Sequence, residues 1–204
     1  TPSDGEADGE PVLASVSIDN TAPEVTAVVL VPAAPQEGDT IAASVSAEDP
    51  DGDELSLGYA WSVDGVLVAD AVEATLTGEH FDKHQEVLVT VTPSDGFVDG
   101  DPVASEPLMV VNTAPRIVNV LLSPVEVYEA TVISCLPQGW GDDDGDAEGY
   151  QYSWELGGAV VGSAATLTGE HFVRGDRLIC SATPDDGEDQ GEALSSDSVT
   201  VRNS

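Results

Sequence analysis

Residues 57–63 read Leu-Gly-Tyr-Ala-Trp-Ser-Val, in which large apolar side chains alternate with small or polar ones. Residues 150–156 read Tyr-Gln-Tyr-Ser-Trp-Glu-Leu and repeat this alternation. Because successive side chains of a β-strand point to opposite faces of its sheet, a period of two predicts a half-buried strand in each segment. Similar apolar alternation occurs elsewhere in the first half of the chain, at 25–31, 41–45, 72–76, 87–91 and 103–111. Segments rich in Gly, Pro and Asp separate these runs and predict turns.

The sequence also repeats itself at a fixed spacing. Thr-Leu-Thr-Gly-Glu-His-Phe occupies residues 75–81 and returns at 166–172, 91 positions later. Asn-Thr-Ala-Pro occupies 20–23 and returns at 112–115. A period of this length is typical of a tandem array of small all-β domains and too long for a solenoid. With about seven strands in each unit and no helical periodicity, the predicted fold is a series of β-sandwiches.

The repeats divide the chain into one partial and two complete units. Residues 1–23 match the end of a unit, residues 24–115 form repeat 1, and residues 116–204 form repeat 2. The partial unit alternates in apolar character from Val12 to Ile18, as a closing strand does. We expect it to be the tail of a preceding repeat, packed against a neighbour. Strand exchange with another copy of the chain is the alternative.

The charge of the chain restricts its partners. It has 39 acidic and 5 basic residues and a net charge of −34, which excludes direct binding of nucleic acid or anionic lipid. Five cationic side chains cannot neutralise this charge, so bound metal ions or high salt must relieve the repulsion. Solubility or adaptation to salt is the alternative explanation. Hydrophobic residues make up 41% of the chain, enough for packed cores. There is no run of 18 apolar residues, so we expect no membrane insertion by this segment.

Both cysteines lie in repeat 2, at positions where repeat 1 has apolar residues that are expected to face its core. When the repeats are aligned, Cys135 falls opposite Ala43 in the second strand and Cys180 opposite Val89 in the sixth. Trp154 lies between them in the third strand. A disulfide between the second and sixth strands, packed on a third-strand Trp, is typical of immunoglobulin-type sandwiches. We therefore expect a Cys135–Cys180 disulfide and an oxidising, extracellular location. Two buried free thiols are the alternative.

Two sets of motifs resemble known families. The strand that carries Trp61 and the Asp-Gly turn after it resemble immunoglobulin-like repeats of large bacterial surface proteins. Residues 19–23, Asp-Asn-Thr-Ala-Pro, together with residues 49–53, Asp-Pro-Asp-Gly-Asp, resemble cadherin-type repeats, which implies calcium between domains. The Asp-Arg-Glu motif of cadherins is missing, and Val111 rather than an acid precedes Asn112. The Trp-Asp-Phe-Gly-Asp-Gly motif of polycystic-kidney-disease repeats is also absent. The resemblance therefore implies calcium more firmly than homophilic adhesion.

The acidic loops have a spacing that suits a hard cation. Asp49, Asp51 and Asp53 alternate with Pro50 and Gly52, and the glycine allows the chain to turn so that the carboxylates converge. Repeat 2 has a matching cluster of Asp142, Asp143, Asp144 and Asp146 around Gly145. Ca²⁺ takes six to eight oxygen ligands and fits this chemistry. A solvated acidic turn is the alternative.

The topology of an immunoglobulin-type sandwich predicts further ligands. The loop after the second strand, the last hairpin and the point of chain entry all lie at one end of such a domain. Junction 1 is accordingly predicted to contain Asp19, Asn20, Asp49, Asp51, Asp53 and Asp95. Junction 2 is predicted to contain Asn112, Asp142, Asp144, Asp146 and Asp186. Glu79 and Asp82, from the far end of repeat 1, are expected to close junction 2 from the other side.

Catalytic motifs are missing from the sequence. Two of the three histidines, His80 and His171, recur within Gly-Glu-His-Phe, which we interpret as a structural corner whose Phe caps the core. There is no nucleophile motif, zinc spacing or phosphate loop. Trp140, in an insertion that repeat 1 lacks, is the one candidate for stacking on a sugar.

These patterns predict a non-catalytic, extracellular array that serves as a stalk, an adhesin segment or a filament subunit. Its expected partners are neighbouring repeats or other copies of itself, with a surface protein or a glycan as a further partner. Calcium is the expected cofactor. The alternative is an accessory module of a secreted hydrolase that binds carbohydrate through the loop around Trp140.

Overall fold

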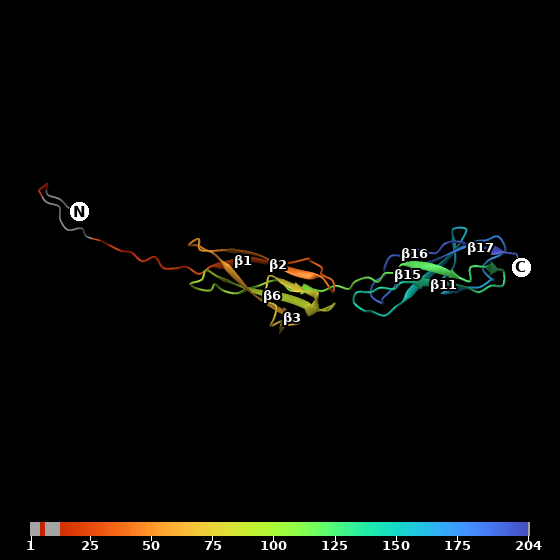
Figure 1. The fold of residues 1–204 in the computed structure, drawn as a ribbon, viewed down its shortest axis with the longest axis horizontal. Coiled ribbons are helices and arrows are strands. Elements are labelled where there is room, and N and C mark those ends of the chain that lie inside the picture. Colours follow the sequence, from red (N-terminus) through yellow and green to blue (C-terminus); the bar gives the residue numbers. More distant parts are fainter. Residues whose placement is uncertain (1–4, 7–12, 204) are drawn as a thin grey trace.

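The chain forms two β-sandwiches that lie end to end, joined by a short connection (Figure 1). This computed structural model describes residues 5–6 and 13–203. The strands fall into two groups, within residues 24–109 and 119–202, and the repeats of the sequence correspond to these two sandwiches. The predicted all-β class and immunoglobulin-like architecture are confirmed. Among the described residues, no helix has the length and apolar character that a membrane crossing requires.

Repeat 1 pairs a three-stranded sheet with a five-stranded one. The smaller sheet has the order β1-β2-β5, and the larger has the order β4-β3-β6-β7, with β8 also paired to β6. Its strands are β1 (Glu24–Val31), β2 (Thr40–Glu48), β3 (Ser56–Val63), β4 (Val66–Leu67), β5 (Thr75–Thr77), β6 (Glu86–Ser94), β7 (Val103–Ala104) and β8 (Leu108–Met109). A single 3-10 turn, η1 (Gly78–His80), follows β5.

Repeat 2 has the same two layers. One sheet has the order β14-β11-β9, and the other has the order β10-β17-β15-β12-β13, with β16 also paired to β15. Its strands are β9 (Asn119–Ser123), β10 (Val127–Tyr128), β11 (Ile133–Gln138), β12 (Tyr150–Leu156), β13 (Ala159–Gly162), β14 (Thr166–Leu167), β15 (Arg177–Pro184), β16 (Leu194–Ser195) and β17 (Val199–Arg202). The central antiparallel pair β12–β15 therefore corresponds to β3–β6 of repeat 1.

Each sandwich has its own core, with a fully buried tryptophan in its third long strand. Trp61 pairs in register with Val89, and Trp154 pairs with Cys180. Both indole rings are fully buried, and each Nε1–H donates to a backbone carbonyl at 2.8 Å. The phenylalanines of the Gly-Glu-His-Phe motifs, Phe81 and Phe172, are buried in the two cores, in agreement with a structural corner.

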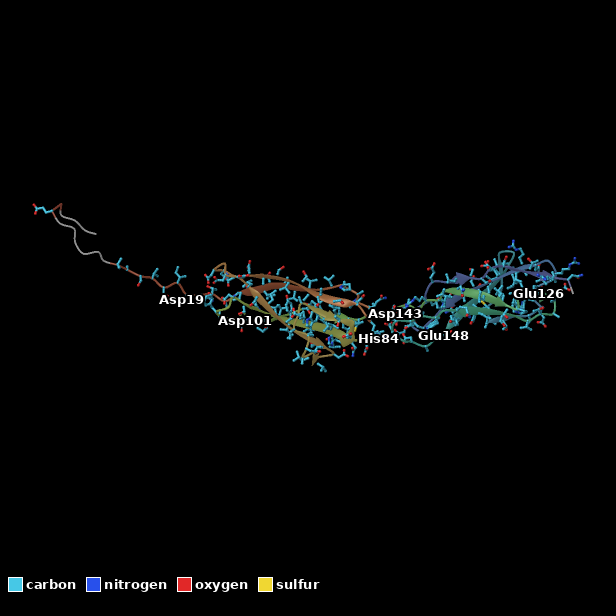
Figure 2. All side chains as sticks on the ribbon, viewed as in Figure 1. Asp19, His84, Asp101, Glu126, Asp143 and Glu148 are labelled. Carbon is cyan, nitrogen blue, oxygen red and sulfur yellow. A yellow bond between two sulfur atoms is a disulfide. The ribbon has the colours of Figure 1, made fainter. Side chains whose placement is uncertain are left out.

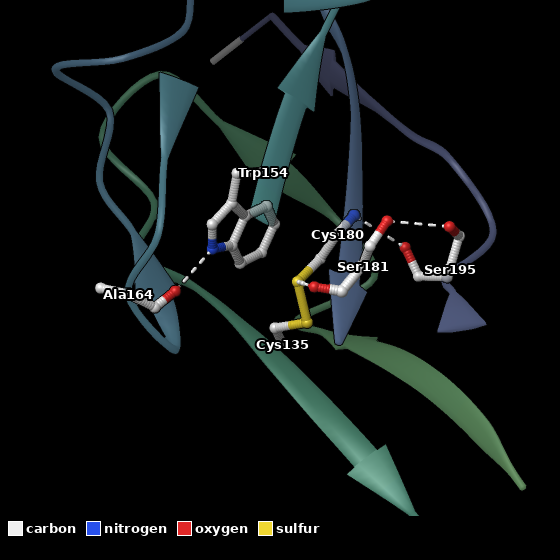
Figure 3. The surroundings of a disulfide bond; sticks show 7 residues. Cys135, Trp154, Ala164, Cys180, Ser181 and Ser195 are labelled. Carbon is white, nitrogen blue, oxygen red and sulfur yellow. Dashed lines mark hydrogen bonds between the residues drawn. A yellow bond between two sulfur atoms is a disulfide. The ribbon is translucent and has the colours of Figure 1, made fainter. Parts of the chain in front are cut away.

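A disulfide joins the two sheets of repeat 2. Cys135 on β11 and Cys180 on β15 are linked beside Trp154, with their Cα atoms 6.1 Å apart (Figure 3). At the matching positions of repeat 1, Ala43 lies on β2 and Val89 on β6. The alignment of the repeats therefore predicted correctly which two strands carry the cysteines.

Two predicted strands differ from the observed ones. The run 103–111 is split into β7 and β8, because Pro107 lies between them and has no N–H to donate to a sheet. The run 72–76 contributes only its end to β5.

The expected closing strand of the partial unit is absent from the structure in its described part, residues 13–18; Val12 lies outside the described residues. Leu13, Val16 and Ile18 are each more than 80% exposed, so the expected packing of this segment does not occur within this chain. A lone strand has no neighbour to satisfy its backbone groups, and this explains the difference.

Candidate metal centres at two acidic junctions

The first acidic loop joins β2 to β3 and folds around the carboxylate of Asp49. Asp49 Oδ1 accepts hydrogen bonds from the backbone N–H groups of Asp51 at 2.8 Å and Asp53 at 3.2 Å. Gly52 has φ of +80°, a left-handed conformation that glycine adopts without strain. The turn brings one oxygen of each of the three carboxylates within 4.8 Å of the others. We call Asp49, Asp51 and Asp53 triad 1.

The second acidic loop, between β11 and β12, has the same construction. Asp142 Oδ1 accepts from the N–H groups of Asp144 and Asp146, both at 3.0 Å, and Gly145 has φ of +74°. Oxygens of Asp142, Asp144 and Asp146 again lie within 4.8 Å of one another. We call these three residues triad 2.

In each triad the first aspartate has a buried oxygen without a hydrogen-bond partner. Asp49 Oδ2 and Asp142 Oδ2 are shielded from solvent, and within the described part of the chain neither accepts a hydrogen bond. A buried carboxylate oxygen that lacks a partner is costly. The same atom is left unpaired at equivalent positions of the two repeats, which is the pattern expected of an atom reserved for a ligand.

The residues that lead into each repeat are bonded to its acidic loops. Thr21 N–H donates to Asp51 Oδ2 at 2.6 Å, and Asn20 Nδ2 donates to Asp95 Oδ2 at 2.7 Å. A surface hollow beside triad 1 is lined by Ile18, Asp19, Asn20, Asp51, Asp53 and Phe97. The structure therefore brings all six predicted residues of junction 1 to one end of repeat 1, where Figure 2 also places Asp19.

Junction 2 repeats these contacts. Thr113 donates from its N–H and from Oγ1, the latter at 3.1 Å, to the carboxylate of Asp144. Asn112 Nδ2 donates to Asp186 Oδ2 at 2.9 Å and to Asp189 Oδ2 at 3.0 Å. All five predicted residues of this junction are therefore brought together. Each asparagine uses its amide N–H to tie the entering chain to the last hairpin of the repeat.

Asp143 belongs to a different interaction. Its carboxylate forms a bidentate pair with Arg116, at 2.9 and 3.0 Å, on the surface of repeat 2. The hydrogen bonds from Arg116 hold the pKa of Asp143 below its ordinary value. Asp143 therefore has a protein cation of its own and does not join triad 2.

Repeat 1 closes junction 2 with residues that the sequence analysis did not single out. Lys83 Nζ contacts Asn112 Oδ1 at 2.9 Å, Glu188 Oε1 at 2.9 Å and the carboxylate of Asp146. His84 Nε2 lies 2.8 Å from Glu188 Oε2, and Figure 2 places His84 at this junction. The sequence feature that could have drawn attention to Lys83 is its charge, because it is the first lysine or arginine in the chain.

Of the two acidic residues expected in that role, Asp82 lies elsewhere and Glu79 lies beside the junction. Asp82 lies over the β3–β4 hairpin of repeat 1, in a hollow that it shares with Val63 and Asp64. Glu79 lines a surface hollow that also includes Thr113 and Asp143, but it is Lys83 that bonds to a carboxylate of triad 2 from the end of repeat 1. In so acidic a junction, a cation lowers the repulsion that a further carboxylate would raise.

The electrostatic environment favours the charged forms of four residues at the junctions, namely Asp95, Asp186, Glu188 and Lys83. The pKa of Asp95 is lowered by the hydrogen bond from Asn20, and that of Glu188 by the hydrogen bond from Lys83. Burial acts to raise the pKa of Asp186, but hydrogen bonds from Asn112 and from two backbone N–H groups lower it overall. The pKa of Lys83 is raised by its hydrogen bonds to Asp146 and Glu188.

These shifts predict how the contact between the repeats depends on pH. A lowered carboxyl pKa gives a stabilising contribution that is present above the ordinary values of 3.8 for Asp186 and 4.5 for Glu188. That contribution disappears as the pH falls through the lowered values. The raised pKa of Lys83 has the opposite sign, and its contribution is lost only well above pH 10.5. We expect the distribution of angles between the repeats, measured by small-angle scattering in chelator, to be narrow at pH 8 and to broaden below about pH 4. A distribution that stays narrow at pH 2.5 would contradict this expectation.

Trp140 is half-buried against the core of repeat 2. Its ring meets Tyr150 edge to face, with centroids 5.7 Å apart, and Tyr150 in turn lies against Tyr152. The hydroxyl of Tyr150 donates to Glu148 at 2.6 Å. This arrangement uses the ring of Trp140 to cover the core beside the acidic loop.

Comparison with known proteins gives similarity in structure alone. No protein-family model and no curated protein matches the chain. A two-domain fibronectin type III segment of chicken tenascin is 12% identical, with a TM-score of 0.45 over 90% of this chain and 100% of the other. Fibronectin(III)-like modules of Clostridium thermocellum CbhA are 18% identical, with a TM-score of 0.31 over 87% and 95%. The N-terminal eight immunoglobulin domains of Down syndrome cell adhesion molecule are 12% identical, with a TM-score of 0.45 over 91% and 25%. At these identities the likeness concerns the fold, and at these scores it carries no argument about function.

Proposed function

We propose that this segment is a non-catalytic part of an extracellular repeat array in which Ca²⁺ stiffens the junctions at the acidic ends of the repeats. The observation that carries the proposal is the pair of buried, unpaired oxygens, Asp49 Oδ2 and Asp142 Oδ2. Each belongs to the first aspartate of a triad whose other members lie within reach of the same ligand. A single solvated turn would not account for the same unpaired atom in both repeats.

The residues present fit a hard divalent cation. Both triads offer carboxylate oxygens, the ligand type that Ca²⁺ prefers, and neither includes the sulfur or imidazole ligands that favour zinc or copper. Asp49, Asp51 and Asp53 would hold one ion, and Asp142, Asp144 and Asp146 the other. A bound ion would neutralise charge within each triad.

Hydrogen bonds would couple the binding of an ion in each triad to the chain segment that connects the domains. Thr21 is bonded to Asp51 and Thr113 to Asp144, so each triad holds the segment through which the chain enters its repeat. An ion that orders a triad therefore also orders the entering chain. The buried disulfide supports an extracellular location, because such bonds persist in oxidising compartments. A stalk, adhesin or filament requires this combination of modular cores and stiff connections.

Calcium is expected to stabilise both repeats. At a free concentration one hundred times its dissociation constant, a ligand adds about 2.7 kcal/mol to the free energy of unfolding, which corresponds to a rise of roughly 10–20 °C in the melting temperature of a domain this size. Calorimetry with Ca²⁺ and with excess chelator measures this shift. Small-angle scattering should show a narrower distribution of shapes with Ca²⁺.

Isosteric variants separate the two sites. Asp51→Asn should remove the calcium-dependent shift of repeat 1, and Asp144→Asn that of repeat 2, because each replaces a triad carboxylate with a neutral amide. Asp70→Asn, which changes an exposed carboxylate outside both triads, is the matched control and should retain both shifts. Identical melting and scattering in Ca²⁺ and in chelator for the unmodified chain would overturn the proposal.

The alternative of a carbohydrate-binding accessory module draws no support from the surroundings of Trp140. A sugar-stacking residue presents an open ring face, whereas Trp140 is half-buried and packs against Tyr150. Glycan binding that is lost on Trp140→Ala would reverse this assessment.

A further inference from the structure

Lys83 contacts three residues where the two repeats meet. It follows η1 in repeat 1, and its ammonium group reaches the linker residue Asn112, the triad residue Asp146 and Glu188 of the last hairpin. The side chain is 16% exposed, so these interactions are formed in a largely desolvated place. Ion pairs of this kind are screened less by salt than exposed ones.

The two triads differ in their relation to cationic side chains. Residues 1–82 contain no lysine or arginine, so triad 1 lies in a stretch of sequence without either. Three of the remaining four cations pair elsewhere: Arg116 with Asp143, Arg177 with Ser198, and Arg202 with Glu126. Glu126, the partner of Arg202, lies at the far end of repeat 2 (Figure 2). In triad 2, one of the three carboxylates is therefore bonded to the ammonium group of a lysine. Triad 1 also has three carboxylates, but it lies in a stretch of sequence without lysine or arginine.

We infer that Lys83 is an internal counter-cation that holds junction 2 together without metal and lowers the affinity of triad 2 for Ca²⁺. The calcium part of this inference rests on the function proposed above. It deepens that function by making the two junctions unequal, so that junction 1 loads at a lower calcium concentration than junction 2.

The physical reason is competition for the same carboxylate. Lys83 occupies an oxygen of Asp146, a member of triad 2, and it adds a positive charge beside the site. Repulsion between a divalent ion and an ammonium group in a partly desolvated site is large compared with the same interaction in water. The contact of Lys83 with Asn112 remains in the absence of metal and fixes the linker against repeat 1.

The test measures Ca²⁺ binding to the full chain by isothermal titration, one site at a time. Asp51→Asn leaves triad 2 as the site under observation, and Asp144→Asn leaves triad 1. In the Asp51→Asn chain, Lys83→Met should tighten Ca²⁺ binding at least tenfold, because methionine keeps the length of the side chain and removes its charge. In the Asp144→Asn chain the same substitution should change the affinity less than twofold.

Two controls isolate the position of the charge. Lys83→Arg keeps the cation and should bind Ca²⁺ as the unmodified lysine does. Arg202→Met removes one positive charge from the far end of the same repeat, so it measures the effect of net charge alone and should change the affinity less than twofold. Unchanged or weaker Ca²⁺ binding by triad 2 after Lys83→Met would overturn the inference.

A second measurement, made without calcium, distinguishes a failure of this inference from a failure of the proposed function. In chelator, Lys83→Met should broaden the distribution of angles between the repeats, as seen by small-angle scattering, while Lys83→Arg keeps it narrow. A Lys83→Met chain as stiff as the unmodified one in chelator would overturn the role of Lys83. Failure of every variant to bind Ca²⁺ would overturn the proposed function and the calcium part of this inference, whereas the chelator measurement would still decide whether Lys83 holds the junction.

Discussion

Replacement of Trp61 by alanine is expected to remove a large part of the stability of repeat 1 and to leave repeat 2 unchanged. The indole is fully buried at the centre of the first core, and its Nε1–H donates to the carbonyl of Glu73 at 2.8 Å. Truncation of a buried Trp costs about 3–5 kcal/mol through lost burial and the cavity that remains. A domain of about 90 residues has a total stability of only about 5–13 kcal/mol. Repeat 1 has no disulfide to offset the loss, because both cysteines lie in repeat 2.

Calorimetry of the variant should show the transition of repeat 1 lowered strongly or lost, and that of repeat 2 unchanged. Trp154→Ala is the matched substitution, since Trp154 is equally buried and donates to Ala164 at the same distance of 2.8 Å. It should destabilise repeat 2 by a similar free energy, but the disulfide should keep that repeat folded at room temperature. A repeat 1 transition in Trp61→Ala within a few degrees of the unmodified protein would contradict the assigned core.

The same periodicity that identifies Trp61 explains why most of the fold was predictable. Alternation in residues 57–63 and 150–156 predicted the third strand of each sandwich, and the observed strands are Ser56–Val63 and Tyr150–Leu156. Long strands that are buried on one face carry this signal over many residues. Short edge strands do not, and the run 103–111, interrupted by Pro107, became two two-residue strands.

The junctions show where sequence reasoning ends. The triads were predictable because their ligands lie within five consecutive residues around a glycine, so their convergence depends on local turn geometry. Asn112 and Asp186 were predictable from the topology of a sandwich. The contacts of Lys83 were not, because Asp146 and Glu188 lie 63 and 105 residues away in the other repeat. Such contacts depend on how two independently folded domains meet, and neither periodicity nor internal repetition contains that information.

Loss of the disulfide is expected to destabilise repeat 2 by about 4 kcal/mol, because the bond closes a loop between cysteines 45 residues apart. That corresponds to a fall of roughly 15–30 °C in the melting temperature of repeat 2, with repeat 1 unchanged. Cys135 and Cys180 are almost completely buried, so a reductant added to the folded protein will reach them slowly. Calorimetry after reduction in denaturant and refolding in the presence of reductant avoids this difficulty.

A double variant, Cys135→Ala with Cys180→Val, provides a control that needs no reductant. It gives repeat 2 the residues that repeat 1 has at these positions, Ala43 and Val89, so the new side chains are ones that this kind of core already accommodates. If the disulfide acts through the entropy of the unfolded chain, the double variant should melt close to the reduced protein and should not respond to reductant. If instead the variant melts with the oxidised protein, packing alone stabilises the core. In that case repeat 2 would have no thermodynamic need of an oxidising environment, and the support that the disulfide lends to an extracellular location would fall away.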